Sequence, residues 1–216
     1  MTRAILWDMD GTLIDSEPVH AAAFDESVAA LGLSFPPDFH DRLLGRSSAE
    51  VHQAVAEKAG PDFTYQDWMD LKWGHFTRHA DNIRRRDSVA DIAVAKAREG
   101  LPMAVVSNST ADEVELCMQA TALNQVIPVR VSRADVQNGK PSPEGYLLAA
   151  QRLGVKPENC LVVEDSLVGS QAGLAAGMRV LYHPQTAADD ADALPAGLRY
   201  LPPDADPAPV IDEMLR

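Results

Sequence analysis

The chain contains little cysteine. Its 216 residues include only Cys117 and Cys160, which stand far apart in the sequence and form no Cys-x-x-Cys pair. This usage argues against a small disulfide-stabilised scaffold and against a thiolate zinc site. It fits a reducing compartment, and we expect the protein to be cytoplasmic.

Long apolar runs are absent as well. Nowhere do 18 apolar residues follow one another, as a membrane-spanning helix would require. Near the N-terminus, Asp8 and Asp10 interrupt the region where a signal peptide would have its apolar stretch. We therefore expect a soluble protein that does not bind a membrane.

Positive charge is in deficit. The sequence has 19 lysines and arginines against 32 aspartates and glutamates, which gives a formal net charge of -13 at pH 7. Such a chain has no overall field that attracts polyanions, so we expect no nucleic-acid partner. Any anionic substrate must meet a local positive site. The 46% hydrophobic content is sufficient for a sizeable core with one insertion, and we expect a monomer.

Short apolar runs that alternate with helical patterns indicate the fold class. The runs that predict buried strands lie at residues 3–7, 103–107, 160–164 and 179–182, with a weaker one at 129–132. The helical patterns between the later runs lie at residues 111–121, 142–153 and 168–176. This alternation is typical of a parallel sheet, so we predict an α/β fold with a Rossmann-like core.

The stretch from residue 16 to residue 86 breaks that alternation. It shows no convincing strand, and its helical patterns lie at residues 17–31, 37–43, 48–58 and 65–82. We predict that residues 16–86 form an inserted helical domain and that residues 1–15 and 87–216 form the core. The acidic, proline-rich C-terminal segment predicts a loose edge with one short helix.

Polar residues follow three of the predicted strands, at the point where each strand ends. They are Asp8 and Asp10 after the first strand, Ser107 to Thr110 after the second, and Glu164, Asp165 and Ser166 after the third, with Lys140 before the next helix. In an open parallel sheet, sites gather beyond the carboxyl ends of the strands. We therefore expect several carboxylates, one lysine and several hydroxyls to converge at one edge.

The crowding of these carboxylates predicts a bound cation. Asp8, Glu164 and Asp165 would repel one another by an energy on the order of several kcal/mol, and the sequence places no compensating arginine among them. A divalent cation would offset this repulsion. Because the ligands are all oxygen atoms, a hard cation is favoured, and Mg2+ suits a site that handles phosphate.

The same residues predict phosphoryl-transfer chemistry. A carboxylate such as Asp8 can attack phosphorus and form an aspartyl-phosphate. A second carboxylate two residues on, Asp10, can protonate the leaving oxygen and then deprotonate water. Gly11 allows a sharp turn after the strand, and Lys140 supplies a fixed positive charge. The groups that can hold phosphoryl oxygens belong to Thr12, Ser107 and Asn108.

These motifs together resemble a known family. The sequences at residues 8–12 (DMDGT), 107–109 (SNS), 140–141 (KP) and 164–166 (EDS) resemble, in order and spacing, the four motifs of the haloacid dehalogenase superfamily. The sequence at residues 15–20 and the helical insertion after the first motif resemble its beta-phosphoglucomutase-like branch, which carries a helical cap. The resemblance covers roughly the first 185 residues.

The resemblance implies a role for each core residue. Asp8 would be the nucleophile and a metal ligand, and Asp10 the general acid/base and a ligand through its backbone carbonyl. Asp165 would be the remaining metal ligand, and Glu164 would bind or orient the metal, directly or through water. The residues implied to hold the transferring phosphoryl group are Ser107 and Lys140, and Lys140 would also steady Asp8.

The resemblance also implies substrate-binding residues in the cap. Gly45 and Arg46 occupy the position of the family's specificity loop, and Lys72 resembles a cap lysine that reaches the distal group of the substrate. His20 resembles a hinge histidine of the mutases. Because an arginine binds carboxylates through two parallel hydrogen bonds, Arg46 favours a sugar-acid or polyol phosphate over a bulky apolar ester.

Three functions remain open from the sequence. The leading hypothesis is a Mg2+-dependent phosphatase acting on a small phosphorylated metabolite, a sugar phosphate or sugar-acid phosphate. The alternative is a beta-phosphoglucomutase-type phosphosugar mutase, which His20 and Lys72 keep open. The third is a phosphate-binding protein without turnover, against which the intact Asp8 and Asp10 argue.

Two further groups of residues have plainer interpretations. His75 and His79 are spaced like zinc ligands, but they lack an accompanying glutamate in the motif and stand beside Arg78, so a solvated helix face is favoured. Residues 84–86 are all arginine and are interpreted as a solvated hinge, with contact to the substrate as the alternative. The resembling branch usually has a Pro-Gly pair at the return from the cap, whereas this chain has the sequence RDSV at residues 86–89.

Overall fold

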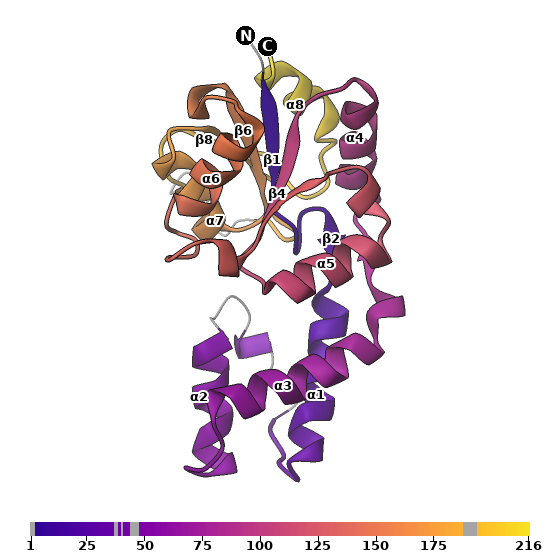
Figure 1. The fold of residues 1–216 in the computed structure, drawn as a ribbon, viewed down its shortest axis with the longest axis vertical. Helices are drawn as coiled ribbons and strands as arrows, with labels where there is room; N and C mark the ends of the chain where they lie inside the picture. Colours follow the sequence, from indigo (N-terminus) through magenta and orange to yellow (C-terminus); the bar gives the residue numbers. More distant parts are fainter. Residues whose placement is uncertain (1–2, 37–38, 40, 44–47, 188–193) are drawn as a thin grey trace. The chain divides into compact units, whose positions relative to one another are not determined.

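The structure is a computed structural model that describes residues 3–36, 39, 41–43, 48–187 and 194–216. The chain divides into two compact units, Met1–Asp15 with Arg84–Arg216, and Ser16–Ile83 (Figure 1). The second unit therefore ends three residues before the expected domain boundary at residue 86.

The first unit is built on a six-stranded sheet in the order β5-β4-β1-β6-β7-β8, and every neighbouring pair is parallel. The strands are β1 (Ala4–Trp7), β4 (Met103–Val106), β5 (Val129–Val131), β6 (Cys160–Glu164), β7 (Arg179–Tyr182) and β8 (Leu198–Tyr200). Every residue of β1, β4 and β6 is buried, as expected for central strands that helices cover on both faces. The predicted α/β, Rossmann-like fold is confirmed.

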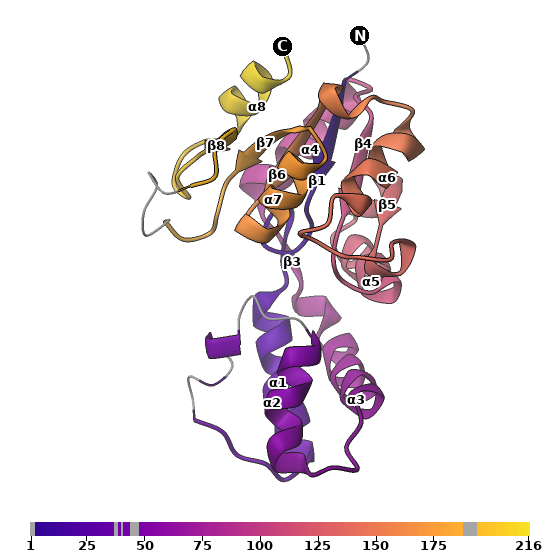
Figure 2. The same ribbon diagram turned by 90° about the vertical axis from the view of Figure 1, so that its left-hand side faces the viewer.

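Helices cover both faces of this sheet. They are α4 (Asp87–Arg98), α5 (Ala111–Ala120), α6 (Glu144–Leu153), α7 (Leu167–Ala175) and α8 (Ala208–Met214). Helices α6 and α7 lie side by side over one face, and α4 and α8 lie over the opposite one (Figure 2). Short 3-10 turns at Leu123–Gln125, Arg133–Asp135 and Pro157–Asn159 connect these elements.

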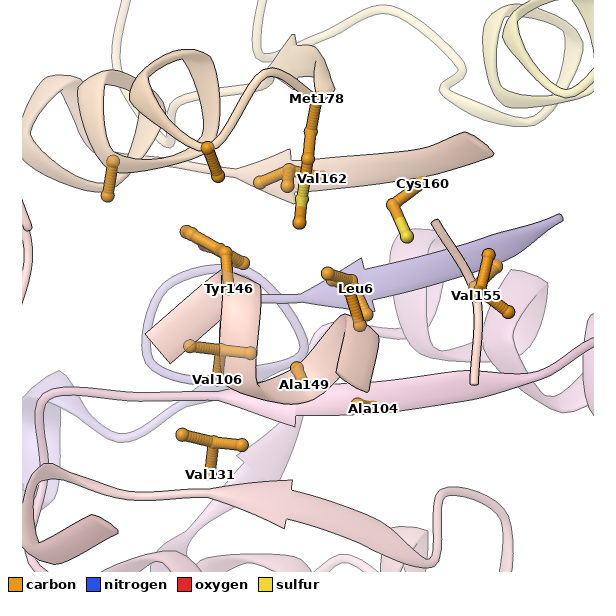
Figure 3. Packing of buried hydrophobic residues seen from close by; sticks show 14 of the residues in the cluster. Leu6, Ala104, Val106, Val131, Tyr146, Ala149, Val155, Cys160, Val162 and Met178 are labelled. Carbon is orange, nitrogen blue, oxygen red and sulfur yellow. The ribbon is translucent and has the colours of Figure 1, made fainter. Parts of the chain in front are cut away.

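The core under α6 and α7 is apolar apart from one phenol. Leu6, Val106 and Val162 point from three adjacent strands toward Tyr146 and Ala149 of α6 (Figure 3). Close packing of α7 requires a residue without a side chain, because a Cβ atom on Gly173 would lie 2.9 Å from Val180. Gly173 of α7 thus allows close packing of the helix on the sheet.

The structure corrects two predictions about strands. The C-terminal segment is more than a loose edge, because β8 pairs in parallel with β7 and extends the sheet. The predicted insertion also contains a strand, since β3 (Arg84–Arg85) pairs antiparallel with β2 (Ile14–Asp15). Both strands are only two or three residues long and include charged residues, so neither forms an apolar run that the sequence would reveal.

The second unit is helical. It contains α1 (Glu17–Ala30), α2 (Ser48–Ala59) and α3 (Tyr65–Arg78), with 3-10 turns at Asp41–Leu43 and Ala80–Asn82. Its core centres on Phe24 and Trp68, whose rings meet edge to face at 5.7 Å. Helix α3 begins at a capping box formed by Thr64 and Asp67, which satisfies two backbone donors. Among the described helices, none combines the length and apolar character needed to cross a bilayer.

Candidate active site

Asp8 follows the central strand β1, at its carboxyl end. Its backbone amide donates to the carbonyl of Val163 at 3.0 Å, which continues the β1–β6 pairing one residue further, and the residue is 8% exposed. The chain then turns at Gly11, where φ is +84°. A Cβ atom there would lie 2.0 Å from Oδ2 of Asp165, so only glycine fits. The turn brings the motif at residues 8–12 against the end of β6.

Lys140 lies between two carboxylates. Its Nζ donates to Oδ1 of Asp8 at 2.5 Å and to Oε1 of Glu164 at 2.6 Å, and its side chain is 6% exposed. Burial alone would lower the pKa of Lys140, but the charges of Asp8 and Glu164 outweigh it and raise this pKa above its ordinary value. The lysine is therefore a permanent cation at the site.

Glu164 is fully buried and holds this lysine in place. Its Oε1 accepts from Lys140 and, at 2.8 Å, from the hydroxyl of Tyr146. Its Oε2 accepts from the amide and the hydroxyl of Ser166, at 3.2 and 2.8 Å. Helix α7 leaves room for the carboxylate at Gly169, where a Cβ atom would lie 1.7 Å from Oε1. These four hydrogen bonds occupy the acceptor sites of the carboxylate.

The carboxylates of the site favour a bound proton or cation. Burial raises the pKa of Asp8 well above its ordinary value, Glu164 adds to this effect, and Lys140 opposes it. Burial, followed by the charge of Glu164, raises the pKa of Asp165 to about 7, against the opposing charges of Lys140 and Arg86. The site is thus short of positive charge.

The donor set fits a hard cation. Carboxylate oxygens of Asp8, Glu164 and Asp165 lie within 4.8 Å of one another. Among hydrogen bonds from the described residues, Asp165 accepts none through its carboxylate, and Asp8 accepts one, at Oδ1 from Lys140. Free, crowded carboxylate oxygens of this kind are the ligands that Mg2+ takes in phosphate-handling sites.

Asp10 is held by hydroxyls from the end of β4. Its Oδ2 accepts from Ser109 at 3.1 Å and, more weakly, from Ser107 at 3.4 Å. Ser109 also lies 3.1 Å from Oε1 of Glu113, in the first turn of α5. The amide of Ser107 donates to Val131, so the β4–β5 pairing fixes the start of this loop. Asp10 is therefore oriented separately from Asp8, as two different roles require.

Asn108 holds the loop that carries Lys140. Its Oδ1 accepts from the amide of Lys140 at 2.9 Å, and its Nδ2 donates to the carbonyl of the same residue at 3.3 Å. Gly139 gives the asparagine room, because a Cβ atom there would lie 2.6 Å from Oδ1. The predicted contact of Asn108 with a phosphoryl group stays a prediction. Thr110 caps α5, since its side chain accepts from the amide of Glu113.

The candidate residues of the second unit lie on different elements. His20 on α1 packs against the ring of Phe76, with centroids 4.6 Å apart, and Lys72 lies on α3. Gly45 and Arg46 fall outside the described residues. The substrate-binding roles of all four predicted residues stay predictions.

The interpretation of His75 and His79 as a solvated helix face is wrong. Nδ1 of His75 and Nε2 of His79 each lie 2.7 Å from an oxygen of Glu26 on α1, and the side chain of His75 is only 13% exposed. The two histidines therefore join α3 to α1 through a shared carboxylate.

Sequence reasoning missed several residues of the core site. Tyr146 looked like a plain core residue of an amphipathic helix, and Ser109 and Ser166 lie inside motifs without a role of their own. The expectation that no arginine compensates the carboxylates is also wrong. The guanidinium of Arg86 donates to the carbonyl of Gly11, beside Asp165. The signal was the arginine run that stands where the resembling branch has Pro-Gly.

Comparison with known proteins agrees with this geometry. The family model described as haloacid dehalogenase-like hydrolase matches residues 5–182. The chain belongs to this family. Among its relatives, the fructose-1-phosphate phosphatase YqaB of Escherichia coli is 33% identical over 181 residues, which cover 81% of this chain and 92% of that protein. The phosphorylated carbohydrates phosphatase of Thermotoga maritima is 27% identical over 193 residues, 89% of each chain.

A solved structure places the chain more closely within the family. A crystal structure from Thermotoga maritima, named as a candidate beta-phosphoglucomutase, superimposes with a TM-score of 0.83 at 25% identity and covers 99% of this chain and 100% of that one. The resemblance to the beta-phosphoglucomutase-like branch of the haloacid dehalogenase superfamily is confirmed. The protein is thus a hydrolase of this branch.

Proposed function

We propose that the protein is a Mg2+-dependent phosphatase that hydrolyses a small phosphorylated metabolite through an aspartyl-phosphate at Asp8. The observation that carries the proposal is the asymmetric environment of this carboxylate. Lys140 holds Oδ1 at 2.5 Å, while Oδ2 accepts no hydrogen bond from a described residue. A carboxylate fixed through one oxygen can direct the other at a phosphorus atom.

Three residues would hold the metal. They are Asp8, Asp165 and Asp10, the last through its backbone carbonyl. Glu164 would orient this group without binding the ion itself, because its oxygens already accept four hydrogen bonds. When bound, Mg2+ would reduce the repulsion between these carboxylates and the phosphoryl group and stabilise the charge on the phosphoryl oxygens.

The chain's own residues would carry out two displacements. In the first, Asp8 attacks phosphorus, the bond to the leaving oxygen breaks, and that oxygen takes a proton from Asp10. In the second, a water molecule attacks the aspartyl-phosphate and gives a proton to Asp10, and the bond from Asp8 to phosphorus breaks. Lys140 and Ser107 would hold the phosphoryl oxygens throughout, with Gly11, Thr12 and Asn108 supporting the loop around them.

The proposed substrate is a phosphorylated sugar or sugar acid. The two named phosphatase relatives support this class, since one is named for fructose 1-phosphate and the other for phosphorylated carbohydrates. His20, Gly45, Arg46 and Lys72 would contact the part of the substrate that is not transferred. We further propose a cytoplasmic monomer that acts without a nucleic-acid or membrane partner.

The test is phosphate release from a panel of sugar phosphates and sugar-acid phosphates, compared by kcat/KM. Turnover should require Mg2+ and stop in excess chelator. Asp8→Asn should be inactive, and Asp10→Asn should lose ~100 to 10,000-fold, most with poor leaving groups. Undiminished turnover in chelator, or in Asp8→Asn, would refute the mechanism.

The second candidate function is a phosphosugar mutase, which the name of the Thermotoga maritima structure favours. A mutase would return the phosphoryl group to another hydroxyl before water reaches the aspartyl-phosphate. Isomerisation of a hexose phosphate that is primed by a bisphosphate and outruns phosphate release would establish the mutase. A phosphate-binding protein without turnover would release nothing from any substrate.

A further inference from the structure

Arg86 lies near the start of the second segment of the first unit, and it contacts the turn at residues 11–13, which follows Asp8. Its backbone amide donates to the carbonyl of Leu13 at 2.9 Å, and its own carbonyl accepts from Val89 and Ala90 at the start of α4. These backbone bonds fix the residue beside the turn that follows Asp8. Its guanidinium then donates to the carbonyl of Gly11.

The guanidinium of Arg86 and the carboxylate of Asp165 both lie next to Gly11. Oδ2 of Asp165 lies 2.0 Å from the position that a Cβ atom of Gly11 would take, while Arg86 binds the Gly11 carbonyl. Asp165 in turn lies within 4.8 Å of Asp8 through carboxylate oxygens. Arg86 therefore lies on the side of Gly11 where its charge acts on Asp165, a carboxylate of the cluster that contains Asp8.

Most of the hydrogen-bonding capacity of Arg86 is unused. A guanidinium has five N–H donors in a planar fork. Within the described part of the chain, one of them is engaged, by the Gly11 carbonyl, and no carboxylate forms an ion pair with Arg86. Lys140 differs, because it contacts both Asp8 and Glu164 directly. Among the described residues, Lys140 therefore keeps one donor for an anion, whereas Arg86 keeps four.

The charges of the site indicate that a bound phosphoryl group would need the positive charge of Arg86. Four carboxylates, on Asp8, Asp10, Glu164 and Asp165, face two cations, Lys140 and Arg86. With a divalent cation bound the cluster is balanced, but a phosphoryl dianion adds two further negative charges. A planar fork beside the metal ligands is well suited to bind two phosphoryl oxygens.

We propose that Arg86 binds the phosphoryl group of the substrate, as a second protein cation alongside Lys140. This inference rests on the proposed phosphatase function. The proposal assigns a binding role to Arg86, which lies at the return from the cap, where the resembling branch usually has a Pro-Gly pair. Arg86 would therefore distinguish this chain in how tightly it holds phosphate.

The proposal predicts opposite effects on two ligands. Loss of the Arg86 charge removes donors to phosphate, so phosphate should bind more weakly. The same loss leaves the carboxylates less compensated, so Mg2+ alone should bind more tightly. A purely structural role in holding the Gly11 carbonyl would weaken both ligands together or neither.

The experiment is isothermal titration of the full-length protein with Mg2+ alone, and with inorganic phosphate at saturating Mg2+. Arg86→Gln should weaken phosphate binding by ~10 to 150-fold, the range for a charge-assisted hydrogen bond, and tighten Mg2+ binding by roughly two- to tenfold. Arg86→Lys keeps the charge without the fork, so phosphate binding should weaken less and Mg2+ binding should stay at the wild-type level.

Arg85→Gln is the matched control, because it removes the same charge one residue away. Arg85 already pairs with Asp87 and Asp91 at 3.1 and 2.8 Å, so both affinities should stay within roughly twofold of the wild type. Circular dichroism would verify that each variant folds. If Arg86→Gln does not fold, unchanged phosphate affinity in Arg86→Lys overturns the proposal.

The outcomes separate this inference from the proposed function. If the wild type neither binds phosphate with Mg2+ nor releases it from any sugar phosphate, the proposed function fails and the inference fails with it. If the wild type is active and Arg86→Gln binds phosphate as tightly as the wild type does, only the role of Arg86 is overturned. The same holds if Arg85→Gln weakens phosphate binding as much as Arg86→Gln does.

Discussion

Each unit of the molecule contains a glutamate shared by several donors from other elements. In the first unit, Glu164 accepts from Lys140, Tyr146 and Ser166. In the second unit, Glu26 on α1 accepts from His75 of α3 and from His79, which follows that helix. The arrangements are alike, but the Glu164 side chain is 0% exposed and the Glu26 side chain is 42% exposed. Burial is therefore the variable that separates them.

The difference in burial assigns the two clusters different roles. A buried charge that loses its partner stays uncompensated in a medium of low dielectric, at a cost of about 3–5 kcal/mol. An exposed charge that loses its partner is hydrated by water instead, and salt weakens the ion pairs that it forms. The Glu164 cluster can therefore fix Lys140 to within a narrow range of positions, whereas the Glu26 cluster can only favour one packing of α1 on α3.

The largest expected effect is that of Glu164→Ala. The variant leaves Lys140 with one carboxylate and leaves the buried hydroxyl of Tyr146 and the partly buried hydroxyl of Ser166 without their acceptor, so the free energy of unfolding should fall by about 3–5 kcal/mol. Urea denaturation of the metal-free protein measures this change. Turnover should fall as well, because Lys140 loses its anchor. A loss below about 1 kcal/mol would show that the buried network contributes little.

The next prediction concerns pH, which should act on the two units with opposite sign. Burial and Glu164 raise the pKa of Asp165 from 3.8 to about 7, so the folded state holds this proton more tightly than the unfolded state does. Protonated Asp165 therefore adds on the order of a few kcal/mol to the free energy of unfolding below about pH 4, and this contribution is lost as the pH rises to about 7. The Tm of the metal-free protein should therefore fall between about pH 4 and pH 7.

Mg2+ and Glu26 provide the contrast for this titration. Excess Mg2+ should recover the lost Tm at about pH 8, because it binds the deprotonated carboxylates. Hydrogen bonds from His75 and His79 lower the pKa of Glu26, so its contribution is present above pH 4.5 and is lost only as the pH falls through the lower folded value. A metal-free Tm that rises steadily from about pH 4 to pH 7 would contradict the sign predicted for Asp165.

The smallest expected effect is that of Glu26→Ala, the counterpart of Glu164→Ala. Its carboxylate is largely exposed, so the urea midpoint should change little and kcat should not change at all. The change that does occur should shrink further in high salt, which screens exposed charges. Equal losses of stability in Glu26→Ala and Glu164→Ala would contradict the conclusion that burial separates the two clusters.

The sequence predicted the parts of the molecule that rest on long patterns or on complete motifs. The central strands are buried apolar runs, and the convergence of Asp8, Lys140 and Asp165 follows from the topology of a parallel sheet. The strands β3 and β8 were missed because two or three residues with charged side chains carry no periodic signal.

The contacts that the sequence could not supply depend on three-dimensional packing. Tyr146 donates to Glu164 only because α6 crosses the sheet next to β1 and β4, and its spacing in the helix is that of any core residue. His75 and His79, at the end of α3, bind Glu26 because α3 packs on α1, although 49 residues separate His75 from that glutamate. Pairings of this kind need the tertiary structure, which local patterns do not encode.

The short ladder of β2 and β3 has a consequence for how such an enzyme changes during evolution. Ile14 pairs with Arg85 and Asp15 with Arg84, so the whole stretch of residues 16–83 leaves the core and returns to it at adjacent positions. For the sheet, this stretch is the loop of a hairpin, and doubling the length of a flexible loop costs only about 0.6 kcal/mol in closure entropy. Mutation can therefore lengthen, shorten or exchange the insert while Asp8, Glu164 and Asp165 keep their places. Proteins with this architecture can therefore change the insert, and with it their substrate, while the residues of the first unit stay the same.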